Sequence, residues 1–278
     1  MRDSLQAPSR ATPRACGIAV LLLTAVLGAC DSSDLSWTDP RPLAPAASEG
    51  RLVVDAQGRT RLVPDSALTI RPPRTPGMCA SSVRMAAQMD SSIVAVWWAV
   101  RPDSSAVLEA ALSSDRGAHW GAPVPVDTAD VSTAGCDRPP PAIATSVGFV
   151  HLVYSMKARD GTGVFYVHSM TRGRSYEPPI AMIYGDRLTR AAVGADRGLV
   201  AVAYEDPNGP APQIGLALSR SWGHAFEDRS RLSAGSGTAS DPQVAVTDRD
   251  VAVSWMVRPR MGDSNAPATR LVRVGRAS

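Results

Sequence analysis

The sequence has few residues of the kinds that carry metal, thiol or nucleic-acid chemistry. Its 278 residues include four cysteines, four histidines and a single lysine, Lys157. The histidines are dispersed along the chain, so we expect no metal site and no cofactor. Basic residues exceed acidic ones by only three, and the arginines are scattered rather than clustered, which argues against nucleic acid as a partner. A phosphate-binding loop and a G-x-S-x-G nucleophile motif in a strand-to-helix setting are also missing.

Long apolar runs are scarce as well, with one exception near the N-terminus. Residues 17–28 read GIAVLLLTAVLG, and Arg2, Arg10 and Arg14 precede them. The run is too short to span a bilayer, but it has the length and the positive flank of a secretory signal.

The end of this run points to a lipid anchor. Residues 27–30 read Leu-Gly-Ala-Cys and resemble the bacterial lipobox, in which the cysteine thiol receives a diacylglycerol. The resemblance implies a lipoprotein signal peptide over residues 1–29, lipidation of Cys30, and a lipidated tether over residues 30–35. The membrane would then be a partner through the lipid anchor, and the protein would reside in the cell envelope, on the periplasmic or the cell-surface side. The alternative is an ordinary signal peptide, or a buried helix that ends in cysteine.

An apolar run that ends in an aromatic residue recurs about every fifty residues. The four runs, IVAVW, VHLVY, VAVAY and VAVSW, end at Trp97, Tyr154, Tyr204 and Trp255. Each has a shorter apolar segment before it and another after it, a pattern typical of consecutive β-strands. The recurrence of Tyr154, Tyr204 and Trp255 at one position of each repeat predicts that these three aromatics pack between repeats.

A second motif follows the third strand of three repeats. Ser113, Asp115, Gly117 and Trp120 match S-x-D-x-G-x-x-W in full. Two weaker copies keep the serine, the glycine and an aromatic, but have a hydroxyl in place of the aspartate: Ser169, Gly173 and Tyr176, then Ser219, Gly223 and Phe226. The carboxylate can accept backbone N–H groups, and the glycine can take a positive φ, so we expect these segments to fold a hairpin rather than to act in catalysis.

These motifs, over about residues 78–274, resemble the Asp-box (BNR-repeat) proteins of the sialidase and neuraminidase superfamily. The resemblance implies an all-β, sialidase-like β-propeller of four-stranded antiparallel blades, about four to six in number, within a domain over residues 36–278. The last blade lacks an outer strand. Residues 37–43 share the W-x-x-P-x-P-apolar spacing of residues 120–126, so residues 36–44 are predicted to pair with residues 271–274 and close that blade. Residues 48–75 resemble a hairpin of a partial fifth blade, which leaves the blade count open.

Two cysteines remain if Cys16 is removed and Cys30 is lipidated. Cys79 and Cys136 each lie 18 residues before the aromatic of their repeat, so they occupy equivalent positions in adjacent blades. A disulfide between them is the expectation in an oxidising compartment, and the alternative is two unpaired small core residues.

Candidate ligand-binding residues are the arginines at or just before three inner strands, Arg84, Arg138 and Arg190. A sialidase of this family would need three arginines to clamp the substrate carboxylate, a tyrosine backed by a glutamate, and an acid/base. Tyr204 and Glu205 are neighbours in a strand, so their side chains are expected on opposite faces. Acidic residues also precede inner strands: Asp137, Asp186 and Asp241.

Two functions fit this reading. The first is a non-catalytic, membrane-anchored binding module for a glycan or an envelope protein. The alternative is an exo-acting glycoside hydrolase of sialidase type with a divergent active site. The Arg-Ile-Pro motif that the family usually carries near its N-terminus is missing here, which favours the first.

Overall fold

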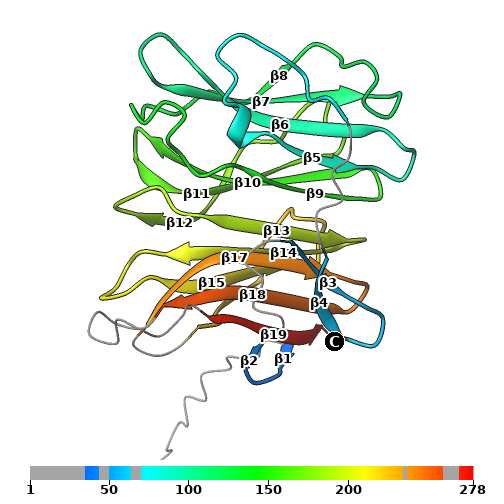
Figure 1. Ribbon diagram of the computed structural model, residues 1–278, viewed down its shortest axis with the longest axis vertical. Helices are drawn as coiled ribbons and strands as arrows, with labels where there is room; N and C mark the ends of the chain where they lie inside the picture. Colours follow the sequence, from blue (N-terminus) through cyan, green and yellow to red (C-terminus); the bar gives the residue numbers. More distant parts are fainter. Residues whose placement is uncertain (1–34, 44–49, 64–69, 234–236, 259–268, 278) are drawn as a thin grey trace, which may run out of the picture. The chain divides into compact units, whose positions relative to one another are not determined.

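Antiparallel strands form almost all of the regular structure (Figure 1). The computed structural model describes residues 35–43, 50–63, 70–233, 237–258 and 269–277. No α-helix occurs in these ranges, and none of their segments is a helix long and apolar enough to cross a membrane. The predicted signal peptide, Cys30 and the tether up to residue 34 lie outside the described residues.

Three consecutive four-stranded sheets follow the predicted repeat. The first, preceded by the 3₁₀ turn η1 (Ala80–Ser82), contains β5 (Arg84–Ala87), β6 (Ile93–Val100), β7 (Ala106–Ser113) and β8 (Val124–Asp127). The second contains β9 (Ala142–Ser146), β10 (Phe149–Ala158), β11 (Gly161–Ser169) and β12 (Ile180–Gly185). The third contains β13 (Ala191–Asp196), β14 (Leu199–Asp206), β15 (Gln213–Ser219) and β16 (Asp228–Arg231). In each sheet the strands pair in chain order, which confirms the predicted all-β fold of four-stranded antiparallel blades.

The fourth sheet is completed by the start of the domain. Its strands are β17 (Thr238–Val246), β18 (Asp250–Arg258), β19 (Thr269–Ala277), β1 (Leu35–Trp37) and β2 (Arg41–Pro42). Leu35 pairs with Ala277, and Pro42 pairs with Leu271. The Thr38 N–H also donates to the Val274 carbonyl at 2.9 Å. The predicted closure of the last blade is therefore confirmed, and it covers the edge that β19 would otherwise expose.

Residues 50–63 form a separate hairpin of β3 (Arg51–Val54) and β4 (Thr60–Val63). It packs on the fourth sheet, where Leu52 and Val54 join a core with Val272. The Gln243 side chain fixes the contact, because it accepts the Leu52 N–H and donates to the Gly50 carbonyl, both at 2.9 Å. The described residues thus hold four sheets of at least four strands and one separate two-stranded hairpin. The hairpin is what a partial fifth blade would contain.

Each pair of neighbouring sheets encloses a layer of apolar side chains, and a predicted aromatic lies in each layer. Tyr154 lies between the first and second sheets, Tyr204 between the second and third, and Trp255 between the third and fourth. Tyr154 meets Trp98 edge to face, with ring centroids 5.8 Å apart. Because strands such as β10 and β14 lie between two other sheets, their sequences are almost continuously apolar.

The inner strands β5, β9, β13 and β17 are consecutive neighbours, and their last residues lie together. The Thr145 hydroxyl donates to the Ala87 carbonyl at 2.7 Å, and the Ser146 hydroxyl donates to the Arg197 carbonyl at 2.9 Å. Arg197 in turn pairs with Asp248 at 2.8 Å. The inner strands therefore run in the same direction. We call the end where they finish the turn end, and the end where they begin the start end.

A disulfide joins the segments that lead into the first two inner strands. Cys79 and Cys136 are bonded, with their Cα atoms 5.5 Å apart. The Cys79 N–H donates to the Trp98 carbonyl at 2.8 Å, so this cysteine is also fixed to the first sheet. The bridge ties two neighbouring sheets together at the start end.

Candidate functional site

The segment Ser113–Trp120, which we call the first box turn, is held by its own side chains. The Ser113 hydroxyl accepts the Gly117 N–H at 2.7 Å, and the Asp115 carboxylate accepts the His119 N–H at 2.8 Å. This backbone bond and the His119 side chain lower the pKa of Asp115 to about 2. Trp120 donates its indole N–H to the Arg71 carbonyl at 2.9 Å. These contacts have the hairpin-forming geometry that the sequence predicts.

The second and third box turns, Ser169–Tyr176 and Ser219–Phe226, replace the carboxylate by a hydroxyl without losing the bond. The Thr171 hydroxyl accepts the Ser175 N–H at 2.9 Å, and the Ser221 hydroxyl accepts the Ala225 N–H at 3.2 Å. A hydroxyl can accept the same backbone N–H that the Asp115 carboxylate accepts. The geometry shared by the three box turns therefore depends on backbone hydrogen bonds.

Left-handed backbone at two successive positions completes each box turn. The glycines have φ of 87°, 89° and 85°, and the residues before them, Arg116, Arg172 and Trp222, have φ of 60° each. Glycine is required for a second reason at Gly223, where an added Cβ would collide with the Tyr166 hydroxyl.

Arg138 is a structural residue rather than a surface contact. Its side chain has 0% exposure and pairs with Asp130, which has 1%, at 2.9 Å. The Arg138 Nε donates to the Gly135 carbonyl at 2.6 Å, and the guanidinium carbon lies 4.9 Å from the centroid of the Trp98 ring. Asp130 also accepts the backbone N–H groups of Ala106 and Lys157, at 3.1 and 3.2 Å. The pair joins the first and second sheets, and burial keeps Arg138 away from a ligand at the surface.

The other two candidate arginines lie at the start end. Arg84 is exposed, and its Nη1 donates to the carbonyls of Ser81 and Val83 at 3.1 and 2.7 Å. The Arg190 side chain is 55% exposed, and its Nε lies 3.1 Å from the Asp241 carboxylate. The structure therefore pairs Arg190 with Asp241, whereas Arg138 forms a buried ion pair with Asp130.

Glu205 lies at the centre of the start-end cluster of Arg190, Glu205 and Asp241. One oxygen of its carboxylate accepts the Asp241 N–H at 2.8 Å, and the other accepts the Arg190 N–H at 3.1 Å. The Glu205 N–H donates to the Arg190 carbonyl at 3.0 Å. Burial raises the pKa of Glu205, against the two backbone bonds, which lower it. Glu205 thus braces β13, β14 and β17.

Asp241 sits in an irregular part of β17, where the pairing register with β18 shifts between Ser240 and Gln243. Its φ is 53°, a conformation that costs a residue with a Cβ some strain and recurs at functional sites. Arg270, only 3% exposed, lies nearby; burial lowers its pKa, and the Asp241 charge opposes that shift. Arg270 was not predicted from the sequence. Polar and apolar residues alternate in β19, so Arg270 looks like any other polar residue of a strand.

Tyr204 does not join this cluster. It packs between the second and third sheets, whereas Glu205 contacts residues of the third and fourth. This confirms the expectation that the two neighbours face opposite ways. Of the other predicted acids, Asp186 pairs with Arg187 at 3.3 Å and Asp137 is exposed.

Three of the dispersed histidines meet between the second and third sheets at the turn end. His151 and His168 are opposite each other in the β10–β11 register, and the His168 and His224 ring centroids are 4.7 Å apart. His151 has 0% exposure, and its Nδ1 lies 2.7 Å from the Tyr166 hydroxyl. Burial, with the two other imidazoles, lowers the pKa of His151 to about 3. Within the described ranges no group of three or more ligand residues could hold a metal ion.

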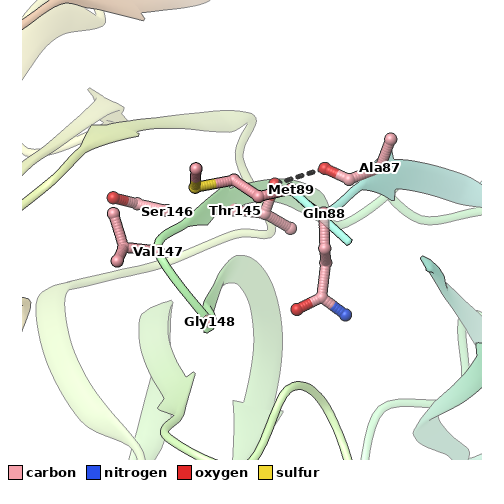
Figure 2. A pocket seen from close by; sticks show the side chains of 7 residues that line it. All are labelled: Ala87, Gln88, Met89, Thr145, Ser146, Val147 and Gly148. Carbon is pink, nitrogen blue, oxygen red and sulfur yellow. Dashed lines mark hydrogen bonds between the residues drawn. The ribbon is translucent and has the colours of Figure 1, made fainter. Parts of the chain in front are cut away.

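A hollow with a volume of about 280 Å³ lies at the turn end between the first two sheets. Figure 2 shows the side chains that line it. Its lining comes from the end of β5, the end of β9 and the turns after them: Ala87, Gln88, Met89, Thr145, Ser146, Val147 and Gly148. Met89 is 84% exposed and Val147 52%. None of the lining side chains ionises, so this hollow has no acid or base for catalysis.

No protein-family model matches the chain, and no curated protein matches it. Solved structures that resemble it include a Hadza microbial sialidase, with 14% identity and a TM-score of 0.44 over 68% of this chain and 45% of that chain. The NanB sialidase from Streptococcus pneumoniae has 12% identity and a TM-score of 0.41 over 69% and 30%. The α-L-arabinofuranosidase PaAbf62A from Podospora anserina has 11% identity and a TM-score of 0.38 over 67% and 70%. This chain spans less than half the length of the two sialidases. Likeness at this level transfers no site and no activity.

Proposed function

We propose that the protein is an exported, membrane-anchored lipoprotein whose sheet domain is a non-catalytic, sialidase-like binding module. Its ligand is a glycan or an envelope protein, which it contacts at the start end. The rigid sheets supply a fixed platform, and Arg84 and Arg190 supply charge at the surface of that end.

The hydrogen bonds and the ion pair within the start-end cluster support a binding role over a catalytic one. Both oxygens of Glu205 accept backbone N–H groups, and Asp241 is paired with Arg190. A general acid must bring its proton within hydrogen-bonding distance of the substrate, and Glu205 is instead occupied in holding three strands. Arg138 is buried in its pair with Asp130, so the three candidate arginines do not form one clamp.

The lipid anchor is tested by the mass of the N-terminal peptide. The full chain is expressed in a bacterial host, and the membrane fraction is digested and analysed by mass spectrometry. We expect a peptide that begins at Cys30 and carries acyl chains. A Cys30→Ala variant should keep residues 1–29 and carry no lipid; an unmodified Cys30 in the wild type would refute the anchor.

The binding role is tested with the detergent-solubilised protein on a panel of immobilised acidic and neutral glycans. We expect retention by a subset of acidic glycans, because arginine pairs with carboxylate and sulfate groups. The Arg84→Gln/Arg190→Gln double variant should lose it. Arg174→Gln, an exposed change at the turn end, is the matched control. Equal retention by the double variant would place the ligand elsewhere.

An exo-acting glycoside hydrolase of sialidase type, with a divergent active site, is the second candidate. The observation in its favour is that Glu205 lies beside Arg190 and that burial raises its pKa, since a raised pKa is a feature of carboxyl groups that act as general acids. Tyr204, on the opposite face of β14, is not available to this site as a nucleophile.

A further inference from the structure

A cavity of about 500 Å³ lies at the turn end between the third and fourth sheets. Three arginines line it, and each comes from a different turn: Arg197 follows β13, Arg220 belongs to the third box turn, and Arg249 precedes β18. Asp196 and Asp248 also line it, so these five side chains carry a net charge of +1. This cavity is remote from the start-end cluster.

The three guanidinium groups have unused hydrogen-bonding capacity. Arg220 pairs with Asp228 at 2.6 Å through Nη1, but its Nε and Nη2 are buried without a partner. Such donors are costly unless an acceptor reaches them, and a small turn of this 30% exposed side chain would present them to a bound oxyanion. The Arg249 side chain forms no hydrogen bond or ion pair with another described residue. Arg197 pairs with Asp248 at 2.8 Å, with the two side chains 68% and 56% exposed, and a pair this exposed yields readily to a competing anion.

The place of the cavity relative to the N-terminal strand indicates where such an anion would come from. Ala277, which lines the cavity, is the pairing partner of Leu35 in β1. Only four residues separate Leu35 from Cys30. Since an extended chain advances at most about 3.6 Å per residue, the two Cα atoms are within about 18 Å of each other. A lipid on Cys30 would therefore hold this cavity close to the bilayer surface.

We propose that the cavity binds the phosphate group of an anionic phospholipid in the membrane that holds Cys30. The inference rests on the lipid anchor of the proposed function. Guanidinium groups pair with phosphate oxygens through two parallel N–H bonds, and a bilayer of anionic lipid attracts juxtamembrane arginines. The headgroup would fix the orientation of the domain, with the start end directed away from the membrane.

The test is native mass spectrometry of the processed full-length protein in detergent. Three probes are added separately: dihexanoyl-phosphatidylglycerol, dihexanoyl-phosphatidylcholine and inorganic phosphate. We expect phosphatidylglycerol to bind in preference to phosphatidylcholine, and Arg197→Gln and Arg249→Gln each to weaken it about fivefold. Arg187→Gln, an exposed change at the start end, should bind as the wild type does.

Equal binding of the two lipids, or wild-type affinity in Arg249→Gln, would overturn the proposal. Arginine-dependent binding of inorganic phosphate without a preference for phosphatidylglycerol would show a site for a free anion and would also overturn it. The same spectra report the mass at Cys30. An unacylated Cys30 would refute the anchor itself, whereas an acylated Cys30 without lipid preference would refute the cavity alone.

Discussion

Replacing His151 by glutamine should make the protein less sensitive to acid. In the folded chain the imidazole is fully buried, bonded to the Tyr166 hydroxyl through Nδ1, and without a partner at Nε2. Burial, with the neighbouring histidines, lowers its pKa from 6.5 to about 3. As the pH falls below 6.5, the unfolded chain binds a proton at this residue and the folded chain does not. Stability therefore falls with pH from about 6.5 until the folded pKa is reached.

The size of the effect follows from the two pKa values. Between pH 7 and pH 5 the linkage lowers the free energy of unfolding by about 2 kcal/mol, at about 1.4 kcal/mol per pH unit once the unfolded group titrates. Glutamine has no proton to gain in this range. Its amide can still hydrogen-bond with the Tyr166 hydroxyl, although it fills less space than imidazole. The comparison is therefore between pH dependences rather than absolute stabilities.

The assay is urea unfolding of residues 33–278, with the disulfide intact, at pH 7 and pH 5. The wild type should lose about 2 kcal/mol more than His151→Gln over this interval. Equal losses in the wild type and His151→Gln would refute the assignment of the acid sensitivity to this buried imidazole.

Three further changes test what holds the sheets together. Replacing both disulfide cysteines by serine should cost about 4 kcal/mol in chemical unfolding, because the bridge closes a 57-residue separation. Arg138→Ala should cost about 3–5 kcal/mol in the same assay, since it leaves Asp130 buried without its partner; a loss below about 1 kcal/mol would contradict the burial of the pair. Gly223→Ala should lower the melting temperature more than Gly58→Ala, because both glycines have positive φ but only Gly223 meets a side chain.

Much of the fold can be read from the sequence because its signals are local. A strand with apolar neighbours on both faces needs a nearly continuous apolar run, which is what the segments that end at Tyr154 and Tyr204 provide. The box motif specifies a turn through bonds within eight residues. The closure of the fourth sheet was also predictable, since the sequence around Trp37 repeats the spacing of a strand elsewhere in the chain.

The parts that escaped prediction depend on contacts between sheets. Nothing in the sequence around Arg138 distinguishes a buried arginine from a surface one, because Asp130 becomes its partner only when the first two sheets meet. The contacts within the histidine cluster were predictable only in part. His151 and His168 lie at equal distances from the turn between β10 and β11, so counting outward from that turn would have paired them. The contact of His224 with His168 requires the third sheet to be in place.

The absence of a glycosidase activity is tested by turnover of a fluorogenic sialic-acid glycoside, measured with the detergent-solubilised protein from about pH 4 to 8. We expect no release of the fluorophore at any pH, because both oxygens of Glu205 accept backbone N–H groups and Arg138 is buried in its pair with Asp130. Release by the wild type that is lost in a folded Glu205→Gln variant would refute the non-catalytic role and make Glu205 the general acid of a glycoside hydrolase.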